Sequence, residues 1–222
     1  MSVLTAPAVS STAVLYDIDW GTYTRFLKVF GKKRFRHTYD RGRLEIMSPI
    51  NFEHDNPSTV LHDLVVVLTE ELNLIRFNGG STTLRFRKKA RGLEPDKWYW
   101  IKNATRMRGK KGAVDFRLDP PPDLAVEVEV SRTVLKRLKI YASLGVPEVW
   151  RLRGGDVKFY QLSRKKYAHT SASLAFPHLK SADLTPFVAR AGLDDDCILV
   201  KQFREWVKQQ LPVWQAQEMP PA

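Results

Sequence analysis

Carboxylates recur at alternate positions in the segment that runs from Asp123 to Glu129. Because side chains alternate between the two faces of a β-strand, Asp123, Glu127 and Glu129 would share one face, and the Leu and Val residues between them would share the other. Neighbouring carboxylates on one face lie about 7 Å apart, so burial requires protonation, nearby cations or a metal ion. An edge strand that faces water would need none of these. The aliphatic alternate face favours a central strand.

A second acidic segment, Glu94-Pro95-Asp96, opens another expected strand. If the two strands are neighbours, Asp96, Glu127 and Glu129 can supply oxygen ligands for a hard divalent cation. Mg²⁺ is the cation that this ligand chemistry favours, with Mn²⁺ as a substitute. Either acidic strand taken alone has a purely structural explanation. The two together predict a metal site.

The elements that must position these carboxylates follow from the spacing of apolar residues. Helical spacing predicts helices at residues 20–30, 52–74, 133–144, 183–191 and 198–210. Alternation and turn signals predict strands at residues 35–39, 44–47, 82–87, 94–101, 124–130, 147–152 and 157–162. The order predicts an α/β fold with a mixed central sheet flanked by helices, an N-terminal helix and hairpin, and C-terminal helices. We expect a flexible tail at 1–15, one domain at 16–210 and a Pro-containing tail at 211–222.

Positive charge dominates the chain of 222 residues, which carries a formal net charge of +12. The charge gathers in basic runs at residues 32–36, 85–91, 106–111 and 164–166. Such runs within a folded domain favour contacts with nucleic acid phosphates, although any one run could be a solvated surface. The longest aliphatic run, residues 64–68, is far too short for a membrane span. With a single cysteine and no signal-like segment, we expect a cytoplasmic protein.

An ordered series of short motifs resembles the Uma-two family of restriction endonuclease-like proteins, within the PD-(D/E)XK nuclease superfamily. The resemblance implies a restriction-endonuclease-like αβββαβ core and an endonuclease that uses Mg²⁺ to hydrolyse phosphodiester bonds of DNA. It spans roughly residues 20–160. Its segments are residues 39–49, 53–54, 80–83, 94–96, 123–129 and 136–150.

The resemblance also assigns roles to individual residues. Asp96 and Glu127 would bind the metal, while the superfamily's strand lysine is replaced here by Glu129. In this family the cation lies on the following helix, which points to Arg137 as a catalytic residue, with Lys136 and Lys139 as auxiliary candidates. An arginine can stabilise negative charge on a phosphate but is a poor base at neutral pH.

Three further residues are auxiliary candidates. Glu53 and His54 lie at the entry to the expected 52–74 helix, where a helix cap or a solvent-facing pair explains them equally well. Glu45 lies on the expected hairpin, where a cross-strand pairing with Arg43 or Arg36 is the alternative to a place in the cleft.

Two other functions compete with a DNA endonuclease. The first is a nucleic-acid-binding protein that keeps the fold but has lost efficient catalysis, which the missing strand lysine favours. The second is a structural or interaction module whose positive charge serves solubility. The sequence leaves a homodimer open.

Overall fold

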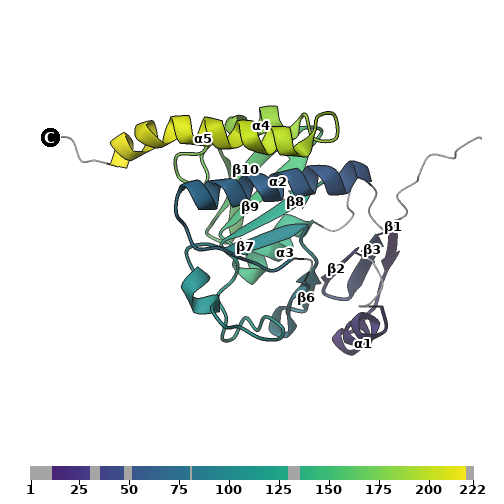
Figure 1. The fold of residues 1–222 in the computed structure, drawn as a ribbon. Helices are drawn as coiled ribbons and strands as arrows, with labels where there is room; N and C mark the ends of the chain where they lie inside the picture. Colours follow the sequence, from purple (N-terminus) through teal and green to yellow (C-terminus); the bar gives the residue numbers. More distant parts are fainter. Residues whose placement is uncertain (1–11, 31–35, 48–51, 81, 130–135, 219–222) are drawn as a thin grey trace, which may run out of the picture.

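The computed structural model describes residues 12–30, 36–47, 52–80, 82–129 and 136–218, with the side chains of residues 52–54 and 217–218 left aside. Their strands form two sheets (Figure 1). The larger sheet has the order β11-β10-β9-β8-β7-β4, and only its β8–β9 pair is parallel. Its strands are β4 (Phe77–Asn78), β7 (Lys97–Trp100), β8 (Leu124–Val128), β9 (Glu148–Arg153), β10 (Asp156–Ser163) and β11 (Lys166–Thr170).

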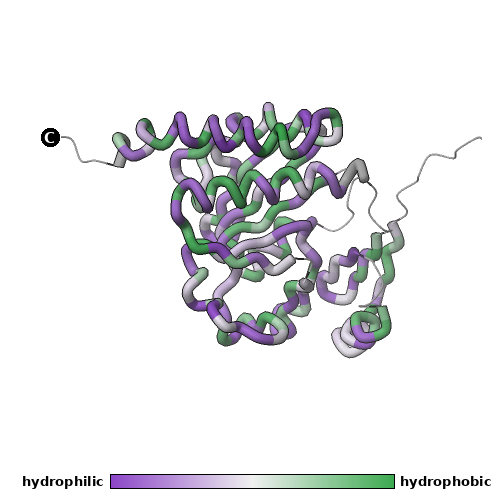
Figure 2. Tube along the Cα trace, in the orientation of Figure 1, coloured by the Kyte–Doolittle hydropathy of each residue, from purple (hydrophilic) through white to green (hydrophobic). Residues whose placement is uncertain are grey.

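Helices cover both faces of this larger sheet. Helices α2 (Phe52–Glu71), α4 (Ser181–Val188) and α5 (Asp196–Glu218) cover one face, where Leu124, Val126 and Val128 of β8 join the largest hydrophobic cluster. Figure 2 shows hydrophobic residues where α2 and α5 turn toward the sheet. Helix α3 (Arg137–Leu144) covers the other face and connects the parallel pair β8 and β9. Strand β8 is therefore buried on both sides.

The smaller sheet has the order β1-β3-β2-β6-β5 and lies beside the larger one. Its strands are β1 (Thr12–Leu15), β2 (Arg36–Asp40), β3 (Arg43–Met47), β5 (Leu84–Phe86) and β6 (Arg91–Leu93). Helix α1 (Trp20–Phe30) packs on one face through Tyr23, which stacks on Tyr39. Position 92 requires glycine, because an added Cβ would overlap the Tyr23 hydroxyl. Two 3₁₀ turns, Arg87–Lys89 and Ala104–Met107, complete the described elements.

The predicted α/β class, the central mixed sheet and the flanking helices are confirmed. The expected strands 82–87, 94–101 and 124–130 do not share one sheet, because β5 pairs with β6 in the smaller sheet. Strand β6 was missed, since it is short and contains a glycine. Residues 94–96 instead connect β6 of the smaller sheet to β7 of the larger one.

Several boundaries also differ from the sequence expectations. Residues 12–15 are not a tail, because β1 pairs with β3. Helix α5 continues to Glu218 through Pro212, so the tail expected from residue 211 is wrong up to that point. Helix α2 ends at Glu71, and α3 begins at Arg137, while residues 130–135 lie outside the described part.

None of the helices that the structure describes is both long enough and apolar enough to span a membrane.

Candidate active site

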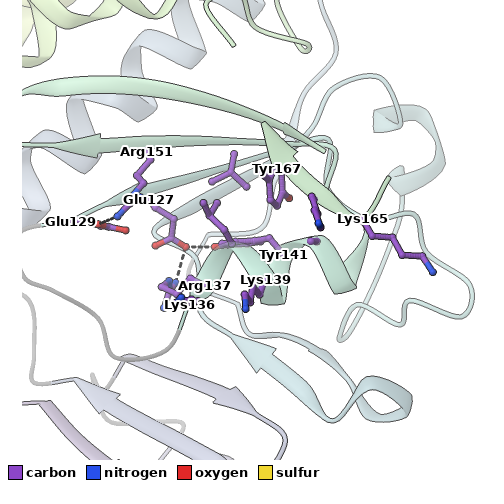
Figure 3. Close-up of a pocket in the computed structure, with 13 residues that line it drawn as sticks. Glu127, Glu129, Lys136, Arg137, Lys139, Tyr141, Arg151, Lys165 and Tyr167 are labelled. Carbon is purple, nitrogen blue, oxygen red and sulfur yellow. Dashed lines mark hydrogen bonds and ion pairs between the residues drawn. The ribbon is translucent and has the colours of Figure 1, made fainter. Parts of the chain in front are cut away.

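Glu127 lies at the centre of the candidate site. Strand β8 directs it toward α3, as the alternation of the sequence predicts, and only 4% of the residue is exposed. Its Oε1 atom accepts a hydrogen bond from the Tyr141 hydroxyl and lies 2.7 Å from Nη2 of Arg137 (Figure 3). Both partners come from α3, where their spacing of four residues places them on one side of the helix.

Arg137, the first residue of α3, contacts both sheets. Its Nη1 donates to Thr38 Oγ1 of β2 at 2.7 Å, and its Nη2 donates to the backbone carbonyl of Glu94 at 2.5 Å. Burial by itself lowers the pKa of Arg137, but Glu127, Tyr141 and Asp96 together raise it above the ordinary value for arginine. The guanidinium is therefore always charged and cannot act as a base at neutral pH.

Asp96 lies at the start of β7, beside Glu127. Its Oδ2 accepts the backbone N–H of Val128 at 2.6 Å, which fixes it against β8. Its Oδ1 forms an ion pair with Nη2 of Arg36, and the same nitrogen lies 4.0 Å from Glu127 Oε2. One guanidinium nitrogen is thus close to both carboxylates.

The donor set around Arg36 fits a divalent cation. The carboxylate of Glu127 on β8, the carboxylate of Asp96 just before β7 and the backbone carbonyl of Glu94, 3.4 Å from Arg36 Nη2, are hard oxygen donors. The guanidinium of Arg36 already lies beside both carboxylates, so a divalent cation would have to take its place. Across the described residues, however, no group of three or more His, Cys, Asp or Glu side chains is arranged as a metal site.

Glu129 shares the face of Glu127 but has a different partner. Its Oε2 pairs with Nη2 of Arg151, the residue on β9 that lies opposite Glu127 in the sheet register. Glu129 is therefore held toward β9 by its ion pair with Arg151.

A cavity of about 530 Å³ opens beside the carboxylates, between α3 and the sheet (Figure 3). Glu127 and Glu129 lie at one end, and Tyr167 of β11 lies toward the other. The auxiliary candidates Lys136 and Lys139 also line it, and both are exposed. The remaining lining residues are Arg137, Leu138, Tyr141, Ala142, Val149, Arg151, Lys165 and Lys166.

The other auxiliary candidates have different positions. Glu45 of β3 is fully buried and lies opposite Thr38, the acceptor of Arg137, so it shares the sheet face that meets α3. Glu53 and His54 lie in the first turn of α2, but their side chains are outside the described part. For these two residues the prediction stays open.

Two residues of the cluster were missed by sequence reasoning. Tyr141 had a usable signal, because it follows Arg137 by four positions on the same helix. Arg36 had none, because its place between Asp96 and Glu127 depends on the packing of the smaller sheet against the larger one.

Burial shifts the pKa values of two residues close to Arg36, His37 and Glu94. His37 is 1% exposed, lies 3.0 Å from the Tyr23 hydroxyl and 3.4 Å from the Glu94 carboxylate. Burial, together with the charges of Arg137 and Arg36, lowers the pKa of His37 to about 3. Burial raises the pKa of Glu94. His37 is therefore a neutral residue at physiological pH.

Comparison with known proteins places the chain in a family. A family model described as "Uma2: Putative restriction endonuclease" matches residues 20–192. The chain belongs to the Uma2 family. This confirms the resemblance drawn from residues 20–160 and supports the coarse functional class of a nuclease. No curated protein matches the sequence.

A solved structure shares the fold of this Uma2 chain. It is the crystal structure of "a putative nuclease belonging to DUF820 from Anabaena variabilis ATCC 29413". The TM-score is 0.50 at 15% sequence identity, and the match covers 68% of this chain and 90% of that one. The likeness supports the restriction-endonuclease-like core.

Proposed function

We propose that the protein is a metal-dependent DNA endonuclease that hydrolyses phosphodiester bonds. One observation carries the proposal: Asp96, just before β7, and Glu127 of the adjacent strand β8 approach a single cationic nitrogen of Arg36, and the charged Arg137 pairs with Glu127. Family membership supports the nuclease class. The net charge of +12 supports a polyanionic substrate such as DNA.

In this proposal Asp96 and Glu127 hold Mg²⁺, or Mn²⁺ in its place. A bound Mg²⁺ would supply Lewis-acid activation of water and neutralise charge on the scissile phosphate. The Val128 N–H holds Asp96, and Tyr141 holds Glu127, so both carboxylates are oriented before a cation arrives. Glu129 can complete the ligand set only by releasing Arg151.

The two arginines have separate roles. Arg137 holds Glu127 in place, and its charge is available to the phosphate as negative charge develops there. Arg36 balances the carboxylates when no divalent cation is bound. Because the two carboxylates pair with two guanidinium groups, these four side chains together carry no formal net charge.

The test is cleavage of supercoiled plasmid and of end-labelled linear DNA with Mg²⁺, Mn²⁺ or EDTA. We expect the wild type to cleave with either metal and to stop with EDTA. Asp96→Asn and Glu127→Gln should each lower the rate by about 100-fold or more. Asp194→Asn, which changes an exposed carboxylate paired with Arg190 away from the cavity, is the matched control and should keep the wild-type rate.

One structural feature favours a second candidate, a DNA-binding protein without efficient catalysis. Each proposed metal ligand is already paired with an arginine, and Glu129 stands where the superfamily has lysine. This candidate predicts DNA binding but the same background cleavage in wild type and Asp96→Asn. That result would overturn the endonuclease proposal.

A further inference from the structure

The cavity beside Glu127 has an apolar part that the proposed hydrolysis does not use. Leu138 and Ala142 of α3 face Val149 of β9 and the ring of Tyr167. Leu138 and Ala142 are half-buried walls of the cavity, whereas Ile140 and Leu144 of the same helix are buried.

The aromatic wall is held in place. The Tyr167 hydroxyl donates to the Val146 carbonyl at 2.5 Å, so the ring is tethered to the segment that follows α3. A tethered ring can stack on a base with little loss of conformational freedom, and such stacking accepts any base because every base has a flat aromatic face. At about 530 Å³ the cavity is in the size range of sites for small organic ligands, which includes a nucleotide.

Positive charge surrounds this apolar part. Lys136 and Lys139 lie on the α3 side, Lys165 lies in the turn between β10 and β11, and Lys166 is the first residue of β11; all four are exposed. A smaller hollow of about 170 Å³ shares Arg151 and continues across the same sheet. It is lined by Arg151, Arg153, Asp156, Lys158 and Tyr160. The carboxylates of the two hollows are paired with cations, so the surface suits a phosphate backbone.

We propose that this cavity receives one unpaired nucleotide of the cleaved DNA strand, with its base against Tyr167 and its phosphates on the lysine rim. The substrate class is therefore DNA with a single-stranded segment next to the scissile phosphate. A base stacked and paired in a duplex cannot enter a hollow of this kind without first leaving the helix. This inference rests on the proposed function, because Glu127 at the end of the cavity marks the scissile position.

Binding measured without metal tests the inference independently of cleavage. Fluorescence anisotropy in EDTA would compare a single strand, a duplex with a short internal gap and the fully paired duplex. Ala142→Phe fills the cavity, and Ala182→Phe makes the same change at an exposed position on α4, across the sheet. Lys165→Glu alters the rim without touching the core, with the exposed Lys201→Glu on α5 as its control.

We expect the wild type to bind the single strand and the gapped duplex at least about tenfold more tightly than the paired duplex. Ala142→Phe and Lys165→Glu should each remove most of that preference, while both control variants keep it. Equal affinity for all three DNAs would overturn the inference, as would an unchanged preference in folded Ala142→Phe and in Lys165→Glu. If the protein cleaves DNA but binds all three DNAs equally, the proposed function stands and the nucleotide-binding role of the cavity is wrong. If it prefers single-stranded and gapped DNA but does not cleave, the nucleotide-binding role is supported and the endonuclease proposal is contradicted.

Discussion

Nη2 of Arg137 lies 2.7 Å from Oε1 of Glu127, although one residue is in a helix and the other is in the strand before it. Both residues are more than nine-tenths buried. A buried ion pair of this kind is costly to break on one side, because the remaining charge has no water to solvate it. The pair therefore links the stability of the fold to the chemistry of the site.

Two substitutions of Arg137 should show how much its positive charge and its side-chain shape each contribute to stability and cleavage. Arg137→Ala leaves Glu127 buried beside fewer cations, so we expect a loss of about 3–5 kcal/mol in the free energy of unfolding and of about 100-fold or more in cleavage. Arg137→Lys keeps the charge and should retain cleavage within about tenfold of wild type. Urea denaturation and plasmid cleavage measure the two effects. Equal cleavage by wild type and a folded Arg137→Ala would exclude Arg137 and direct attention to Lys136 and Lys139.

Tyr141 is expected to act as a positioning residue. Burial and the negative charge of Glu127 raise its pKa well above 10, so the phenol remains a hydrogen-bond donor. Tyr141→Phe removes one bond to a charged group, which should cost about 1.5–3 kcal/mol of stability. It should also lower kcat more than it raises KM. The exposed Tyr16→Phe is the control, and an unchanged kcat in Tyr141→Phe would contradict this role.

Sequence patterns predicted which site residues share a strand face, but not the contacts that depend on how strands and sheets pack together. Alternation along residues 123–129 placed Glu127 and Glu129 on one face, because strand periodicity is local. The same pattern could not assign Arg151 to Glu129, since that contact depends on the parallel register of β8 and β9. Arg36 lay beyond prediction for a related reason, because its position follows from the packing of two separate sheets.

Acid should destabilise the protein through His37. Its pKa is lowered to about 3 in the folded chain but is about 6.5 when unfolded, so between these values the unfolded state binds more protons. The contribution of neutral His37 to the free energy of unfolding is complete above about pH 6.5. It falls by at most about 1.4 kcal/mol per pH unit as pH decreases toward 3. Urea denaturation at pH 7.5, 6.5 and about 5.5 measures this slope.

The matched variants for this pH dependence are His37→Gln and His169→Gln. His37→Gln keeps hydrogen-bonding atoms but cannot titrate, so its stability should change less with pH than that of wild type. His169 is exposed on β11, and its variant should follow the wild-type slope. If wild type and His37→Gln gave the same slope, the buried neutral histidine would not be the source.

DNA binding should be strongly salt-dependent. Each phosphate neutralised by Lys or Arg contributes about 0.9 to the slope of log affinity against log salt concentration. Lys165→Glu should reduce the magnitude of the slope by about 1 or more, and Lys201→Glu, on the helix that covers the opposite sheet face, should leave it unchanged. A flat titration of wild type would remove the nucleic-acid substrate from the account.

The most direct test of the central claim is a crystal structure of the wild type with Mn²⁺, with the metal located by its anomalous signal. The account predicts one peak between the carboxylates of Asp96 and Glu127, with the guanidinium of Arg36 moved away from its present position between them. An Asp96→Asn crystal grown in the same way should show a weaker peak or none. A wild-type map with Arg36 still in contact with Asp96, and with no anomalous peak at the two carboxylates, would contradict the account.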